Sequence, residues 1–264
     1  MNITFVTCWY KMKSKFNVKT YEEWMKNFLN NVKNFNLVIY TNKESYSLVE
    51  RYKENENITI VLKEFEEFKT FKHDWAKNHE RNDLLNGKKH HNIDWRLNML
   101  WNEKISFVND VIKEKIYETE WYGWCDIGYF RSAGFDIKKW PNPKKIETLN
   151  KDKIYYARVA NSISINNLVK LILNKNEYGL PVKEIPPDQV SIAGGFFILH
   201  KSKINWWINT YYETLNLYFK HRYLVKDDQI IIINSIVDNL KNFEIVMEKN
   251  KRMDPWFVFQ RYLL

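Results

Sequence analysis

Short apolar runs alternate with amphipathic segments along the first part of the chain. Residues 3–8, 37–40 and 58–62 are rich in β-branched and aromatic side chains, and each run predicts a strand. Between the first two runs, Thr20 and Glu23 have the spacing of a capping box, and apolar residues then recur at helical intervals, which predicts a helix. Strands that alternate with helices predict an α/β fold with a largely parallel sheet.

The rest of the chain continues this pattern after an irregular connection over residues 63–91. A long helix is expected over residues 93–115, and the apolar run 121–127 predicts a fourth strand. A turn around Pro141 and Pro143 marks the only plausible boundary between lobes. The remaining expected elements are strands over residues 154–159, 190–200 and 243–247, and helices over residues 163–173, 203–218 and 227–240.

Length and composition indicate a soluble intracellular protein. A chain of 264 residues buries enough surface to fold without disulfides, and its two cysteines, Cys8 and Cys125, lie inside apolar runs, which favours reduced core thiols. The first residues lack the basic start of a signal peptide, and no apolar run approaches the length of a membrane span. We therefore expect a cytoplasmic protein without a transmembrane segment.

The net charge of +9, from 41 Lys and Arg against 32 Asp and Glu, favours anionic partners such as nucleic acid, a membrane surface or phosphorylated small molecules. The basic residues are interleaved with acidic ones rather than collected in stripes, and no recognised nucleic-acid-binding motif occurs. Nucleic acid is therefore not an expected partner. The excess of lysine also fits the codon usage of an AT-rich genome.

The sharpest candidate for chemistry is the segment 121–131, WYGWCDIGYFR. It places Asp126 at the end of an apolar strand and Gly128 two residues later. Open α/β sheets bind ligands beyond the carboxyl ends of their strands, where a carboxylate can hold Mg²⁺ or Mn²⁺ against a diphosphate. The same carboxylate could instead cap an ordinary turn, and this pattern alone does not decide between the two.

Together with WNEK at residues 101–104, this segment resembles the HtrL/YibB family of bacterial and viral glycosyltransferases. Four further segments agree with that family in their order: ITFVT (3–7), VIYTN (38–42), GGFF (194–197) and DDQ (227–229). The resemblance implies an α/β fold of one GT-A-like domain over residues 1–264, with a Rossmann-like mixed sheet flanked by helices. Residues of about 1–135 would form the nucleotide-sugar-binding half, and residues of about 136–264 the acceptor half.

The resemblance also implies the reaction, which is transfer of a sugar from a nucleotide diphosphate sugar, UDP-sugar above all, to a hydroxyl of a glycan, lipid-linked or protein acceptor. Asp227 and Asp228 are the implied catalytic acids, with Asp228 as general base if the reaction inverts the anomeric centre. Acids in the first turn of a helix are also favoured by its dipole without any function. Asn234, five residues after Gln229, instead matches a pattern of retaining, glycogenin-like enzymes, so the stereochemistry stays open. The residues expected to bind the donor are Thr7, Tyr10, Thr41 and Asn42 at the base and ribose, Arg96, Lys104 and Arg131 at the phosphates, and Asp126, Gly128, Gly194 and Gly195 in the rest of the donor site.

A divalent metal, Mn²⁺ or Mg²⁺, is implied by the Asp-x-Asp motif of such enzymes. Asp126 matches its first acidic position, but Gly128 stands at the second, and one carboxylate is a weaker metal site than two. His200, at the end of the strand that contains Gly194 and Gly195, is a candidate second ligand; a satisfied, half-buried histidine is the alternative. The glycine pair itself either lets a ligand approach the backbone closely or marks a bulge.

The C-terminal segment 252–256, RMDPW, is expected to close the donor site. Two rival functions stay open beside the transferase. The first is a catalytically degenerate GT-A fold that binds a nucleotide or a glycan without turnover. The second, less favoured by the sequence, is a basic nucleic-acid-binding protein.

Overall fold

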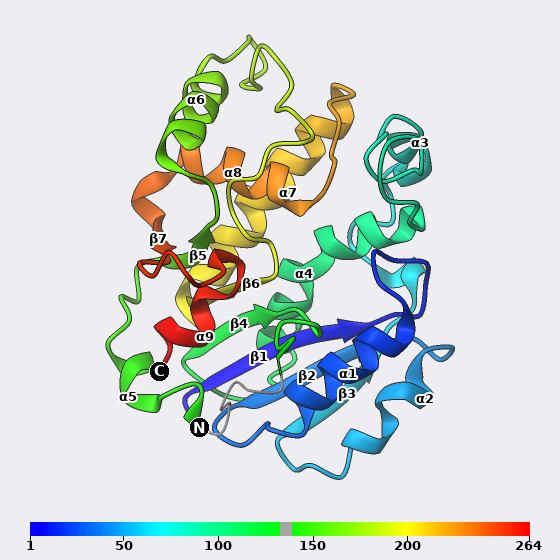
Figure 1. The fold of residues 1–264 in the computed structure, drawn as a ribbon, viewed down its shortest axis with the longest axis vertical. Coiled ribbons are helices and arrows are strands. Elements are labelled where there is room, and N and C mark those ends of the chain that lie inside the picture. Colours follow the sequence, from blue (N-terminus) through cyan, green and yellow to red (C-terminus); the bar gives the residue numbers. More distant parts are fainter. Residues whose placement is uncertain (133–138) are drawn as a thin grey trace.

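The structure, a computed structural model, describes residues 1–132 and 139–264. These residues form a seven-stranded sheet in the order β3-β2-β1-β4-β6-β5-β7, with helices packed against it (Figure 1). The predicted α/β class with a mixed sheet flanked by helices is confirmed. The strands are β1 (Ile3–Trp9), β2 (Asn36–Thr41), β3 (Ile58–Leu62), β4 (Trp121–Cys125), β5 (Ile154–Arg158), β6 (Phe196–His200) and β7 (Phe243–Met247).

The long helices follow the predicted pattern, but α1 begins earlier than expected and short helices occur in segments where none was predicted. The first helix begins at Val18 rather than after Thr20, because the Asn17 side chain accepts a hydrogen bond from the Thr20 N–H at 2.9 Å. The connection over residues 63–91, expected to be irregular, contains two short helical segments. The α-helices are α1 (Val18–Leu29), α2 (Tyr46–Val49), α3 (Trp75–Glu80), α4 (Trp95–Lys113), α5 (Pro143–Glu147), α6 (Ser162–Leu173), α7 (Ile204–Lys220), α8 (Asp228–Asp238) and α9 (Val258–Tyr262); the 3₁₀ segments are η1 (Glu50–Tyr52), η2 (Phe65–Glu67), η4 (Lys201–Lys203), η5 (Leu240–Asn242) and η6 (Pro255–Phe257).

One reversed strand determines which chain segments meet at the edge of the sheet. Strands β1 to β4 run parallel to one another and β5 runs parallel to β7, whereas β6 is antiparallel to both of its neighbours. Its register pairs Phe196 with Cys125 and His200 with Trp121, so β6 begins where β4 ends. The start of β6 therefore lies at the same edge as the carboxyl ends of β1 and β4.

Side chains alternate between two hydrophobic cores, one on each face of the sheet. Val6 and Trp124 pack into a core with α4, α7 and α8, while their neighbours Phe5 and Cys125 pack into a second core with α1 and α9. Figure 1 shows α1 lying across strands β1 to β3 on the second face. Burial on both faces explains why these strands read as continuous apolar runs rather than as alternating patterns.

Helix α4 is anchored to the long connection before it by a buried carboxylate. Glu103 is fully buried and accepts hydrogen bonds from the Lys69 N–H at 2.8 Å and the Thr70 N–H at 3.1 Å. Burial raises the pKa of Glu103 to about 7, although these hydrogen bonds favour the charged form. Because Lys104 is the next residue, this anchor also positions the side chain at the centre of the site described below.

Several sequence-based expectations concern the chain as a whole. Cys8 and Cys125 are free thiols, as predicted, and burial raises the pKa of both. Among the helices of the described residues, none has the length and apolar character needed to cross a membrane. The expected boundary between two halves, at about residue 135, lies outside the described residues.

The raised pKa of Glu103 predicts a pH-dependent stability. Its carboxyl binds a proton more tightly in the folded chain than at its ordinary pKa of 4.5, so its favourable contribution is complete below pH 4.5 and is lost as the pH rises through about 7. In urea titrations, the difference in unfolding free energy between wild type and Glu103→Gln should fall by about 3 kcal/mol over this window. Glu213→Gln, on the exposed side of α7, is the control and should show a flat difference. Parallel pH profiles for wild type and Glu103→Gln would contradict the prediction.

Candidate functional site

A buried ion-pair cluster lies at the carboxyl edge of the sheet. The Lys104 ammonium from α4 lies 3.1 Å from Asp126 Oδ1 and 3.0 Å from Asp228 Oδ2. It also donates a hydrogen bond to the Gly194 carbonyl at 2.8 Å. Three oxygen atoms therefore surround the ammonium within 3.1 Å, one by a hydrogen bond and two by ion pairs.

Asp126 is held by the end of β4. Its backbone N–H donates to the Gly195 carbonyl at 2.9 Å, and the indole N–H of Trp124 donates to its Oδ1 at 2.5 Å. The Asp126 side chain keeps 41% of its surface exposed, in contrast to 7% for Lys104. Asp126 is therefore fixed on one side by the cluster and remains open to a ligand on the other.

The two acids that precede and open α8 have different roles. Asp227 is the N-cap of the helix: its side chain accepts from the Gln229 N–H, and its carboxylate lies 2.7 Å from the Lys226 ammonium. Asp228, the first helical residue, turns inward to Lys104. The capping explanation thus applies to Asp227, whereas Asp228 belongs to the cluster.

The glycine pair makes room for both carboxylates. A Cβ atom on Gly194 would lie 2.7 Å from the carboxylate oxygens of Asp228, and one on Gly195 would lie 3.1 Å from Asp126 Oδ2. The strand expected over residues 190–200 in fact begins at Phe196, because the two glycines form a turn before it. The predicted bulge within the strand is therefore wrong. The glycines allow close approach of the Asp126 and Asp228 side chains, and close approach of a ligand stays a prediction.

Burial and the neighbouring charges change the pKa values of both Asp228 and Lys104. Burial raises the pKa of Asp228 to about 6, against the opposing effect of the Lys104 ammonium, and the charges of Asp227 and Asp126 raise it further. Burial disfavours the charge on Lys104, but the attraction of Asp126 and Asp228 outweighs it, and the lysine pKa is raised. Lys104 is therefore a permanent cation, while Asp228 titrates close to the neutral range.

A cavity of about 460 Å³ opens beside the cluster. Its walls combine charged and aromatic side chains, which gives it both ionic and stacking surfaces. The charged lining residues are Lys15, Lys104, Asp126, Arg131, Asp227, Asp228 and Asp254, and the aromatic ones are Phe16, Tyr21, Trp101, Tyr129, Trp256 and Phe257. Asp254 and Trp256 belong to the C-terminal segment that was expected to close the site, and they do line this cavity.

A narrower pocket of about 100 Å³ adjoins this cavity, between the end of β1 and helix α4. It shares Lys104, Asp126 and Gly128 with the larger cavity, so the two spaces meet at the ion-pair cluster. Most of its remaining walls are apolar or aromatic, among them Cys8, Trp9, Tyr10, Trp24, Leu97, Leu100, Trp101 and Trp124.

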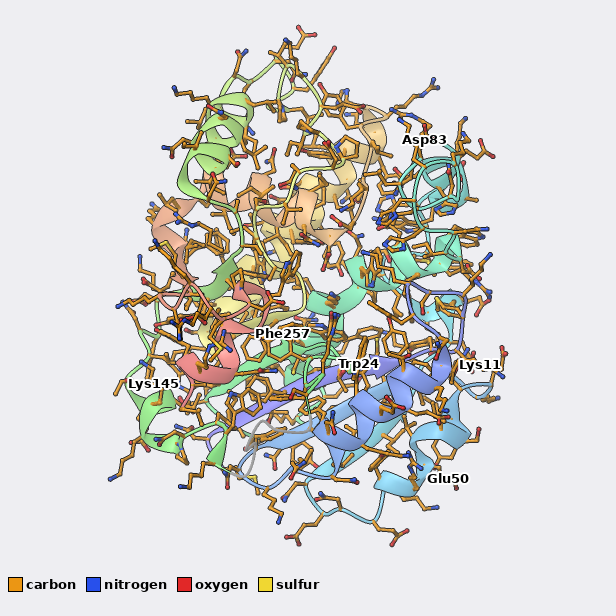
Figure 2. All side chains as sticks on the ribbon, in the orientation of Figure 1. Lys11, Trp24, Glu50, Asp83, Lys145 and Phe257 are labelled. Carbon is orange, nitrogen blue, oxygen red and sulfur yellow. The ribbon has the colours of Figure 1, made fainter. Side chains whose placement is uncertain are left out.

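Arg131 lines both spaces and is held by one aromatic residue from the wall of each. Its guanidinium lies 4.4 Å from the ring centroid of Trp24 and 5.2 Å from that of Phe257, two residues labelled near the centre of Figure 2. Its Nε–H donates to the Gly128 carbonyl at 3.3 Å. A Cβ on Gly128 would lie 2.6 Å from the Trp24 ring, so the glycine is needed for this packing.

Two of the expected donor-binding residues bond to the backbone, and a third is buried inside a strand, so none of the three faces the cavities. Thr7 lies inside β1 and is fully buried. The Thr41 hydroxyl donates to the Trp9 carbonyl at 2.7 Å, and the Asn42 side chain accepts from the Ser45 N–H at 3.0 Å. None of the three lines either cavity in the described part of the chain, so the expectation that they contact a ligand is not supported by their positions.

Of two further residues expected to bind the donor, Tyr10 lines a cavity and Arg96 does not. Arg96 pairs with Asp94 at 2.5 Å and lies outside the residues that line either cavity, so the structure does not bring it to the site. Tyr10 lines the narrow pocket, where its hydroxyl donates to the Lys63 carbonyl at 2.8 Å. One further cation on the cavity wall was not singled out by the sequence: the Lys15 ammonium lies 4.9 Å from the ring centroid of Trp101.

The expectation that His200 joins Asp126 in a metal site is wrong. In the antiparallel register His200 lies opposite Trp121, five strand residues or roughly 17 Å from Asp126. Its ring instead bonds to Ser202 at 2.8 Å and Glu120 at 3.1 Å, which matches the alternative of a satisfied histidine. Within residues 1–132 and 139–264, no group of three His, Cys, Asp or Glu side chains is placed to hold a metal ion.

The close approach of Gly194 to Asp228 predicts strong coupling between these positions. Gly194→Ala should push the carboxylate away from Lys104 and lower the unfolding free energy by about 1 to 3 kcal/mol. In the Asp228→Ala background the new Cβ meets no carboxylate, so the same change should cost at least about 1 kcal/mol less. A double-mutant cycle by denaturant unfolding measures this difference, and additive costs would contradict it.

Comparison with known proteins adds no family assignment: neither a protein-family model nor a curated protein sequence matches the chain. The resemblance to the HtrL/YibB family stays a prediction that rests on the motifs. The functional argument therefore depends on the geometry of the site.

Proposed function

We propose that the protein is a GT-A-type glycosyltransferase that moves a sugar from a nucleoside diphosphate sugar, UDP-sugar first among the candidates, to an acceptor hydroxyl. The observation that carries this proposal is the placement of Asp126, Asp228 and Lys104 beside a cavity of about 460 Å³ at the carboxyl edge of the sheet. The order of the first four strands reverses between β1 and β4. Open α/β sheets bind ligands beyond such a reversal point.

The two connected spaces suit the two parts of a nucleotide sugar. Aromatic rings stack on the flat faces of bases, so the narrow pocket walled by Trp24, Trp101 and Trp124 is the proposed base site. Arg131 and Lys15, both lining the larger cavity, supply positive charge for the diphosphate. The sugar would then lie in the larger cavity beside the two acids.

Asp228 is the proposed general base of an inverting reaction. The acceptor hydroxyl gives its proton to the Asp228 carboxylate while its oxygen bonds to the anomeric carbon. The bond from that carbon to the diphosphate oxygen breaks, and its electron pair leaves with the diphosphate. A pKa of about 6 leaves Asp228 ionised at neutral pH and still basic enough to take a proton.

A binding protein without turnover is the second candidate, and the glycine at position 128 favours it. That glycine replaces an acid of the Asp-x-Asp motif, so the fold could retain a nucleotide and lack catalysis. A nucleic-acid-binding protein is less favoured, because the basic residues are interleaved with acidic ones along the chain rather than collected in stripes.

A screen of nucleoside diphosphates and nucleotide sugars by thermal shift, followed by a transfer assay, tests the proposal. A ligand at about 100 times its dissociation constant stabilises the folded chain by about 2.7 kcal/mol, which is readily detected. Stabilisation with release of nucleoside diphosphate supports the transferase. Stabilisation without release supports the binding protein, and no stabilisation by any nucleotide would overturn both.

Replacement of the proposed base should reduce turnover without loss of donor binding. Asp228→Asn is expected to lower kcat by about a hundred- to ten-thousand-fold, because the acceptor proton has no base to receive it. In the wild type, activity should fall as the pH drops through about 6, since protonation removes the base. Asp238→Asn, at the other end of α8, is the matched control and should leave kcat unchanged. A product with retained anomeric configuration would remove the base assignment from Asp228.

A further inference from the structure

We infer that the ammonium of Lys104 takes the place of a divalent cation in this site, so that a nucleoside diphosphate binds without a resident metal ion. This inference rests on the proposed function for the identity of the ligand. Its structural basis is independent of that function: one buried cation already lies between the two carboxylates that would have to hold the metal.

The Lys104 ammonium and a divalent cation cannot both occupy the position between the two carboxylates. Asp126 and Asp228 both approach the same nitrogen atom, at 3.1 and 3.0 Å. A divalent cation bridging two carboxylates would lie about 2.0 to 2.6 Å from their oxygens, in the space that the ammonium fills. Ammonium and metal are also both positive, so each would exclude the other from this position.

Lys104 is not free to leave. Its side chain is 7% exposed, it donates a hydrogen bond to the Gly194 carbonyl, and it lies 5.7 Å from the ring centroid of Trp124. Withdrawal would leave Asp228, which is 5% exposed, as a buried carboxylate without its cation. Breaking such a pair is strongly destabilising, because it leaves an uncompensated charge in the interior.

The other residues that were considered as metal ligands do not form a metal site either. Gly128 stands where a second acid of the motif would be, and the Trp24 ring lies 2.6 Å from where its Cβ would be, so no side chain fits there. His200 lies at the opposite edge of the sheet. Mg²⁺ and Mn²⁺ prefer several oxygen ligands, and among the described residues no three His, Cys, Asp or Glu side chains are grouped so that they could hold a metal ion.

The Lys104 ammonium reduces the repulsion between the two carboxylates and a bound diphosphate. Without Lys104, the cluster would present two carboxylates to an anionic ligand; with it, the cluster carries one net negative charge. Three oxygen atoms already surround the Lys104 ammonium, so direct contacts with the phosphates fall to Lys15 and Arg131, which line the same cavity. Lys104 acts through the acids it neutralises rather than by touching the ligand.

Calorimetric titration with UDP, in EDTA and in Mn²⁺, tests the metal-free binding. We expect the two dissociation constants to agree within about threefold, which is less than 1 kcal/mol. Binding that requires Mn²⁺ would overturn the inference and leave the proposed function standing. Failure of UDP and the other nucleotides to bind under either condition would instead overturn the proposed function, and the metal measurement below then decides the inference.

Binding of Mn²⁺ alone, followed by its EPR signal, needs no nucleotide. Wild type should show no site dependent on Asp126, whereas Lys104→Gln should gain one Mn²⁺ site by freeing two carboxylates. That site should weaken at least about tenfold in Lys104→Gln/Asp228→Asn. Lys175→Gln, which frees Asp238 from a 2.9 Å ion pair elsewhere, is the matched control and should gain none.

Two outcomes would count against the inference in this experiment. Wild type that binds Mn²⁺ and loses it on Asp126→Asn would show that the ammonium does not exclude the metal. Lys104→Gln that folds and gains no Mn²⁺ would show that the two acids are not a latent metal site. If Lys104→Gln does not fold, the comparison of wild type with Asp126→Asn decides alone.

Discussion

The buried charge of Lys104 is the constraint on which the site depends. An ammonium removed from water needs a partner for each donor, and its partners come from the end of β4, the turn before β6 and the start of α8. These segments are far apart in the sequence, so the lysine is satisfied only when the first and last parts of the chain have packed around α4. The same contacts that compensate the buried charge also place two carboxylates at the wall of the cavity.

The reversal of β6 is what makes this convergence possible. A parallel strand beside β4 would bring its carboxyl end to the cavity edge, whereas the antiparallel strand brings the turn formed by Gly194 and Gly195. Because these residues lack side chains, the two carboxylates can occupy the space where their Cβ atoms would lie or lie close beside it. Strand direction and the glycine pair therefore act together, and neither would build the cluster without the other.

Local patterns predicted most elements, and non-local geometry accounts for what they missed. The apolar runs located β3 and β7 to the residue, because each is a short run of mainly β-branched and aromatic side chains flanked by polar residues. Asp126, Asp228 and the glycine pair were recognised because acids and glycines beside apolar runs are locally unusual. The direction of a strand depends on which strands it pairs with, and local sequence patterns do not show this. The reversal of β6 and the distant position of His200 could therefore not be predicted. A polar residue at the end of a strand can either bind a ligand or bond to the backbone, and the sequence does not distinguish these cases. The Thr41 hydroxyl bonds to the backbone of β1.

The absence of an acid at position 128 and the presence of a lysine inside the cluster are parts of one arrangement. A third carboxylate beside Asp126 and Asp228 would leave two net negative charges, more than a single ammonium can balance, and would favour a divalent ion instead. Gly128 avoids that charge and also lets Trp24 pack closely enough to hold Arg131 at the cavity wall. Gly128 thus sets both the number of acids that a cation must neutralise and the position of Arg131 at the cavity wall. The glycine that departs from the expected motif is, on this argument, the counterpart of the buried lysine.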